Sequence, residues 1–77
     1  MSKIDEIYEA ILPEMAAHDL EDTTEHRLWF LEGLRDGWRE DDSDACIEKG
    51  LYVMTVTLEM MSLRIQLALE NWRMNHA

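Results

Sequence analysis

The sequence predicts an all-α fold: a small single domain, residues 1–77, of three helices with a long C-terminal helix that pairs two copies into a homodimer. Three observations support this prediction. Apolar residues recur at spacings of three and four in three segments, which is the period of one face of a helix. One short stretch alone reads as a strand, so a sheet would lack a partner for its backbone. The third segment also carries more apolar surface than the first two can cover.

The first helix is expected over residues 3–18. Ser2 is a suitable N-cap, because its hydroxyl accepts a bond from a free backbone N–H of the first turn. Pro13 lies inside the pattern, where it lacks an N–H and clashes with the preceding turn, so we expect a kink or a break near residues 11 and 12. The apolar face that follows Ser2 consists of Ile4, Ile7, Tyr8, Ile11, Leu12 and Met15.

The second helix is expected over residues 23–38. Asp22 and Glu25 have the spacing of a capping box, and the two threonines between them are alternative caps. Gly33 and Gly37 weaken this helix by about 1 kcal/mol each relative to alanine. Their spacing of four indicates either the close approach of another helix or simple tolerance near a helix end. The apolar face consists of Leu28, Leu31, Leu34 and Trp38, with Phe30 beside it.

The third helix is expected over residues 43–74, although residues 50–61 (GLYVMTVTLEMM) contain β-branched residues that favour a strand. Apolar residues extend beyond both ends of this stretch at spacings that alternate between four and three, as in the seam of a heptad repeat. Because β-branching costs only about a few tenths of a kcal/mol per residue, the heptad pattern decides for a helix. The seam consists of Ile47, Leu51, Met54, Leu58, Met61, Ile65, Ala68 and Trp72.

A second apolar line runs along the same helix, so its apolar surface is wider than one seam. Some 30 residues, at a rise of about 1.5 Å each, form a rod of roughly 45 Å that two short helices cannot cover on all sides. Two-fold self-association is the commonest way to bury a surplus apolar face. The second line consists of Val53, Val56, Met60, Leu63 and Leu67, and the seam residues expected at the dimer interface are Ile47, Leu51, Met54, Leu58, Met61, Ile65 and Trp72.

The formal net charge is −10, and it is concentrated in the first 44 residues. Residues 18–44 hold ten acids against three arginines, a net of −7, whereas the charges of residues 45–77 cancel. Nucleic acids and anionic membranes are polyanions that proteins bind with lysine and arginine. We therefore expect no direct nucleic-acid partner and no membrane partner, and instead a protein partner with a basic surface.

The sequence carries no motif that indicates catalysis, a cofactor or a metal. His18, Glu21 and His26 match no standard zinc spacing, and the acids of 42–53 fail the calcium-loop pattern. The lone Cys46 excludes an intramolecular disulfide and is expected to be a small buried residue. We therefore expect a cytoplasmic protein that is not an enzyme and binds no cofactor.

The acidic segment, residues 19–44, has two interpretations. It is either a solvated face that keeps an apolar dimer soluble, or a surface that docks on a basic site, where its carboxylates stand in for the phosphates of a nucleic acid. In the second interpretation the partner-binding residues are Asp36, Glu40, Asp41, Asp42 and Asp44.

In size, acidity and lack of a catalytic motif, the chain resembles the small inhibitors encoded by phages and mobile elements, anti-CRISPR proteins and transcription-factor antagonists among them. The resemblance is one of type and is carried by no particular residues. It implies a protein that binds and modulates or inhibits another protein through its acidic surface.

Two other classes stay open. One is a helical adaptor subunit whose long helix fills a groove in a larger complex without inhibiting it. The other is a small enzyme or metal binder built across a dimer interface. The adaptor predicts an isolated chain that aggregates or folds poorly, the inhibitor predicts a stable soluble dimer, and the metal content of the purified protein tests the third class.

Overall fold

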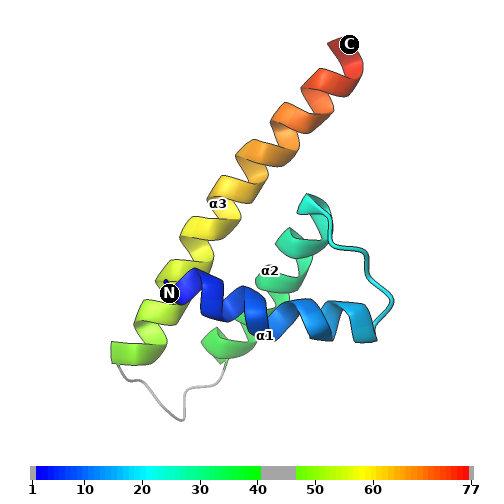
Figure 1. Cartoon of the computed structure of the whole chain (residues 1–77). Coiled ribbons are helices and arrows are strands. Elements are labelled where there is room, and N and C mark those ends of the chain that lie inside the picture. The colour runs from blue at the N-terminus through cyan, green and yellow to red at the C-terminus, as the bar shows by residue number, and fades with distance from the viewer. Residues whose placement is uncertain (1, 41–46, 77) are drawn as a thin grey trace.

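The fold consists of three helices: α1 (Lys3–Ala17), α2 (Thr24–Glu40) and α3 (Ile47–His76). The structure, a computed structural model, describes residues 2–40 and 47–76, and the side chains of these except for 38–40, 47 and 48. The predicted all-α fold is confirmed. Figure 1 shows that α1 and α2 pack beside the first two thirds of α3, whose C-terminal end projects past them and makes the molecule 48 Å long.

Helix α1 begins and ends with local backbone signals. Ser2 and Asp5 form a reciprocal capping box, which confirms Ser2 as the N-cap. At the other end, Asp19 adopts a left-handed conformation with φ of 59°, and the N–H of Leu20 bonds the carbonyl of Met15 at 2.9 Å. Of the kink or break expected near Pro13, the break is absent. The helix continues through this residue, with Ile11 and Met15 buried on either side of it in the same core.

The N-cap of α2 is Thr23. The capping box that we expected Asp22 and Glu25 to form does not cap this helix. The hydroxyl of Thr23, one of the two alternative caps, accepts a bond from the N–H of His26 at 3.1 Å. The carboxylate of Asp22 instead pairs with Arg27. Thr24 bonds Glu70 near the end of α3, and α2 ends seven residues before α3 begins, so the two helices are antiparallel neighbours.

Helix α3 contains the stretch 50–61, where β-branched residues competed with the helical period. The hydroxyls of Thr55 and Thr57 donate to the carbonyls of Leu51 and Val53, each at 2.8 Å. Both hydroxyls therefore bond to carbonyls of the helix itself, so these two β-branched side chains are accommodated within the helix. The stretch is therefore helical, as the heptad pattern predicted, and the expected start at residues 43–46 lies outside the described residues.

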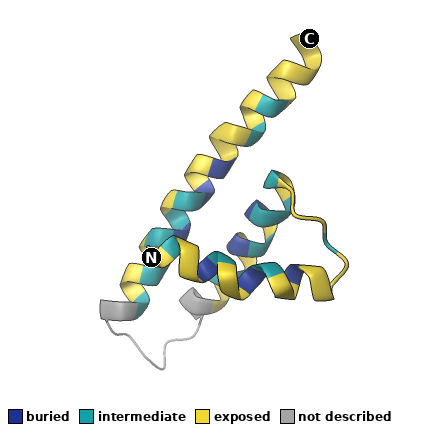
Figure 2. Cartoon of the chain, viewed as in Figure 1, coloured by how far each residue is buried: buried dark blue, intermediate teal, exposed yellow. Residues whose placement is uncertain are grey.

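The core lies where the three helices meet. Figure 2 shows its buried residues on the side of α3 that faces α1 and α2, while the last residues of α3, 71–76, are all exposed. The second apolar line of α3 supplies Val56, Met60 and Leu63 to this core. The other buried members are Ile7, Ile11, Met15, Leu28 and Leu31.

The two glycines of α2 face open space. A Cβ atom built on Gly33 or Gly37 would meet nothing within 4 Å, so no described helix approaches them closely. Simple tolerance is therefore the interpretation that fits the structure. Over the described ranges 2–40 and 47–76, none of the three helices has the length and apolarity needed to cross a membrane.

Candidate protein-interaction surface

The apolar seam of α3 lies on the outside of the molecule. Its six described large side chains keep between 44% and 64% of their surface exposed, and Ala68 among them is also exposed. Contiguous exposed apolar patches are uncommon on monomeric proteins and mark candidate interaction surfaces. We call this surface the outer row: Leu51, Met54, Leu58, Met61, Ile65, Ala68 and Trp72.

The outer row and the core line occupy opposite sides of one helix. Met60 is fully buried, whereas the next residue, Met61, is 53% exposed. Side chains one residue apart lie about 100° apart around a helix, so the packing of α1 and α2 on one side leaves the other side free. Of the predicted seam residues, Ile47 belongs to α3, but its side chain lies outside the described part of the chain.

The margins of the outer row are nearly uncharged. Flanking positions at the heptad spacing carry Thr55, Thr57, Ser62, Arg64, Leu69 and Asn71. Arg64 is the one charged residue among these six, and Leu69 is a further apolar side chain at 51% exposure. A second helix could therefore lie along the row without meeting a ladder of like charges.

The last turns of α3 extend beyond the rest of the molecule. Every residue from 71 to 76 is exposed, and Met74 keeps 80% of its surface in water. The Trp72 ring stacks on the His76 ring with centroids 4.3 Å apart. A helix end without tertiary contacts gains little stability from propensity alone.

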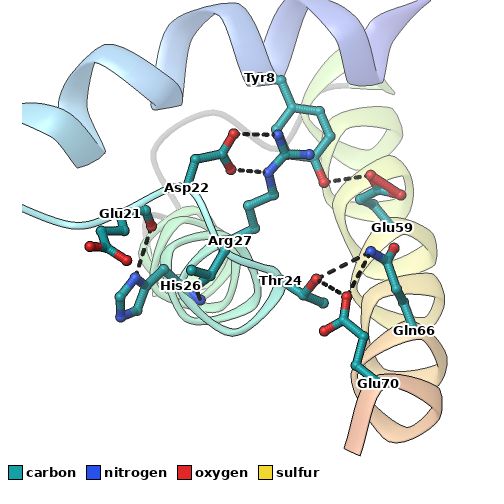
Figure 3. A network of polar contacts seen from close by, with 10 residues as sticks. Tyr8, Glu21, Asp22, Thr24, His26, Arg27, Glu59, Gln66 and Glu70 are labelled. Atoms are coloured by element: carbon teal, nitrogen blue, oxygen red, sulfur yellow. Dashed lines mark hydrogen bonds and ion pairs between the residues drawn. The ribbon is translucent and has the colours of Figure 1, made fainter. Parts of the chain in front are cut away.

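The inner side of α3 is tied to the other helices by a polar network that the sequence did not reveal (Figure 3). Tyr8 on α1 donates its O–H to the Glu59 carboxylate on α3 at 2.5 Å. The guanidinium of Arg27 lies 4.6 Å from the centre of the Tyr8 ring and pairs with both oxygens of Asp22. One network thus joins all three helices.

The pKa values in this network follow from its contacts. Burial, together with the hydrogen bond to Glu59 and the negative charge of that residue, raises the pKa of Tyr8 above its usual value. The hydrogen bond from Arg27 lowers the pKa of Asp22, and the same bond raises the pKa of Arg27. Each group is held in the charge state that its partner needs, which suits a structural role.

A second polar cluster joins the start of α2 to the end of α3. Thr24 donates to Glu70 at 2.9 Å, and the Gln66 amide donates to both Thr24 and Glu70, at 3.2 and 3.3 Å. Both Glu59 and Gln66 lie on the side of α3 away from the outer row and contact the other two helices. Nothing local in the sequence connects Tyr8 to a residue 51 positions away.

The predicted acidic partner-binding residues lie mostly outside the described part of the chain. Asp36 is exposed on α2, and its carboxylate lies 3.5 Å from Arg35. Glu40 ends α2 but its side chain is not described, and Asp41, Asp42 and Asp44 fall outside the described residues. The structure therefore does not test whether these five residues form one surface.

A cleft of about 500 Å³ opens where the three helices meet. Two carboxylates of α1 lie beside an apolar lining, so the cleft suits an apolar group that carries positive charge. It is lined by Glu6, Ile7, Ala10, Ile11, Glu14, Phe30, Leu34 and Tyr52.

The rings of two histidines of the described ranges, His26 and His76, contact neighbouring groups of their own helix or its start. The His26 ring lies 2.8 Å from the Glu21 carbonyl and near the Trp29 ring, and His76 contacts the Trp72 carbonyl. Within residues 2–40 and 47–76, no three His, Cys, Asp or Glu side chains are grouped to hold a metal ion. The lone Cys46 lies outside these ranges.

The chain matches no protein-family model, and no curated protein and no solved structure is significantly similar to it.

Proposed function

We propose that this chain is a non-enzymatic protein-binding module: a homodimer paired through the outer row of α3, which docks its acidic residues on a basic surface of another protein and so modulates or inhibits that protein. The exposed outer row is the observation that carries the proposal. A protein of this kind fits the type of small inhibitor that phages and mobile elements encode.

The size of the exposed surface supports a second copy. The chain exposes 5660 Å² at a mass of 9.1 kDa, whereas a compact monomer of that mass exposes about 4,900 Å². The excess, roughly 800 Å², matches the area that each partner buries in a standard protein interface. The outer row supplies six of the large apolar side chains that the chain leaves exposed.

The distribution of charge supports the same arrangement. The acids belong to residues 1–44, while the charges of residues 45–77 cancel. Because α1 and α2 pack on the side of α3 opposite the outer row, pairing through this row keeps the two acidic halves apart. It also turns those halves outward, where they can meet a basic partner.

A pair of matched variants tests the dimer by light scattering. Leu58→Glu places a charge in the outer row at a side chain that is 63% exposed, so the monomer should still fold. Trp29→Glu makes the same change on α2, at an apolar side chain that is 57% exposed. We expect Leu58→Glu to give a monomer and Trp29→Glu to remain a dimer. An unchanged mass for Leu58→Glu would contradict the proposal.

The acidic docking surface is tested with two variants of equal charge. One changes Asp41, Asp42 and Asp44 to Asn, and the other changes Glu6, Glu9 and Glu14 to Gln. We expect the first to lose a protein that the unmodified chain captures from host lysate and that mass spectrometry identifies, and the second to retain it. Retention by the first variant would remove these aspartates from the binding surface.

The outer row also favours a second function, that of an adaptor subunit. In that case the groove of a larger complex, and not a second copy, covers α3. The isolated chain would then be monomeric and prone to aggregation, and the Leu58→Glu variant would be more soluble than the unmodified chain. A stable dimer in dilute solution argues against the adaptor.

A further inference from the structure

We infer that the two copies pair antiparallel along α3, in the register that sets Leu58 of one copy opposite Met61 of the other. This inference rests on the dimer proposed above and adds its orientation. The same register sets Met54 opposite Ile65 and Leu51 opposite Ala68. It covers the outer row from Leu51 to Ala68 and brings Trp72 against the first turn of α3 in the second copy.

The sizes of the side chains favour this orientation. In a parallel pair each residue of the row meets itself, so two Ala68 side chains would leave a gap beside the crowded layer of two Trp72 rings. In the antiparallel pair the small Ala68 meets the larger Leu51. Facing a large residue with a small one fills the space between helices evenly, whereas a void and an overpacked layer both destabilise.

The margin of the row selects the register. Moving the antiparallel helices by one heptad in one direction would set Arg64 of one copy beside Arg64 of the other, which brings two like charges together. The proposed register sets Arg64 beside Thr57 instead. Like charges at facing positions destabilise a helix pair, so this shifted register is the poorer one. Moving the helices by one heptad in the other direction would leave Ala68 and Trp72 of each copy with no facing residue of α3.

The charges at the two ends of α3 favour the same orientation. Lys3 lies 4.7 Å from the centre of the Tyr52 ring, so the acidic first turn of α1, with Asp5 and Glu6, lies at the start of α3. The last turn of α3 carries Arg73 and His76. Antiparallel pairing separates the two basic ends, which a parallel pair would bring together, and opposes the two helix dipoles.

Spin-label distances test the orientation directly. In a Cys46→Ser background, a nitroxide is attached either to Met74→Cys or to Ser62→Cys, both of which are exposed in the structure. Ser62 lies near the two-fold axis of the proposed pair, so its two labels lie close together in either orientation. Light scattering of each labelled protein shows whether it is still a dimer.

The two labels at residue 74 separate the alternatives. The proposed register sets them roughly 29 residue rises apart along the axis, or about 44 Å. About 33 Å or about 54 Å would indicate a register shifted by one heptad in one direction or the other, and less than roughly 20 Å a parallel pair, and any of these results would overturn the inference. If neither label shows spin–spin coupling, the dimer itself, and with it the proposed function, is contradicted.

Discussion

The two sides of α3 differ in what they contact, although the same heptad-like spacing of apolar residues builds both. The inner side, with Val56, Met60 and Leu63, is buried under α1 and α2 and tied to them by Tyr8 and Thr24. The outer row has residues as apolar as these and no cover from the described chain. Apolar periodicity therefore identifies candidate buried surfaces, and the packing of the remaining helices decides which of them stays exposed.

Adjacent methionines give the largest expected effect and the sharpest contrast between the two sides. Met60→Ala should lower the free energy of unfolding by about 3 kcal/mol at any protein concentration, because it leaves a cavity in the core. Met61→Ala should cost less than about 1 kcal/mol at low concentration, and more only where the dimer is populated. Urea denaturation at a low and a high protein concentration measures both. If both variants lowered the free energy of unfolding equally at low concentration, the two sides of α3 would not differ in burial as described.

The contact between Tyr8 and Glu59 tests how the inner side is held. Tyr8→Phe removes a hydrogen bond to a charged acceptor and should lower the free energy of unfolding by about 1.5 kcal/mol. Glu59→Gln serves as the second arm of a double-mutant cycle, in which the two losses should not add. Full additivity would mean that the two side chains do not depend on each other.

The same contact predicts a loss of stability at high pH. The pKa of Tyr8 is raised in the folded state, so its contribution is fully present below the unfolded value of about 10 and is lost as the pH rises above it. The unmodified chain should therefore lose more stability above that pH than Tyr8→Phe does. If the free energies of unfolding of the two proteins fell in parallel with pH, the ionisation of Tyr8 would not cause this loss.

Gly33 tests whether α2 carries an interface of its own. Gly33→Ala should raise the free energy of unfolding by about 1 kcal/mol, since alanine favours the helix and its Cβ would enter open space. The dimer measured by light scattering should be unaffected, in contrast to changes in the outer row. A weakened dimer would show that the glycine face of α2, and not only α3, contacts the second copy.

The pair of Asp22 and Arg27 should have the smallest effect. Both side chains are partly exposed, so solvent screening limits Asp22→Asn to a loss of less than about 1 kcal/mol. The pKa of Asp22 is lowered in the folded state, so this loss is present above the unfolded value near 4 and vanishes as the pH falls through the folded value. Denaturation curves at pH 7 and in acid compare the two proteins.

Much of the fold could be predicted from the sequence because it depends on local period. The three helices and the division of α3 into an inner line and an outer row follow from spacings of three and four. The cap at Ser2 follows from its hydroxyl side chain. Pro13 and the cap of α2 were interpreted less well. Core burial around Pro13 and a hydrogen bond to Thr23 overrode the local signals.

The contacts between helices could not be predicted in the same way. Tyr8 and Glu59 are 51 residues apart, and Gln66 and Thr24 are 42 apart. Each has an ordinary place on its own helix, and the pairing depends on how the helices cross. The acidic residues around 41–44 remain a prediction from charge, and they lie outside the described residues.

The most direct test of the central claim is the mass of the unmodified chain by sedimentation equilibrium over a range of concentrations. Burial of the outer row against a second copy predicts a single reversible equilibrium that approaches twice the 9.1 kDa mass of the chain. A mass that stays at 9.1 kDa at every concentration, for a chain that is folded and does not aggregate, would contradict it.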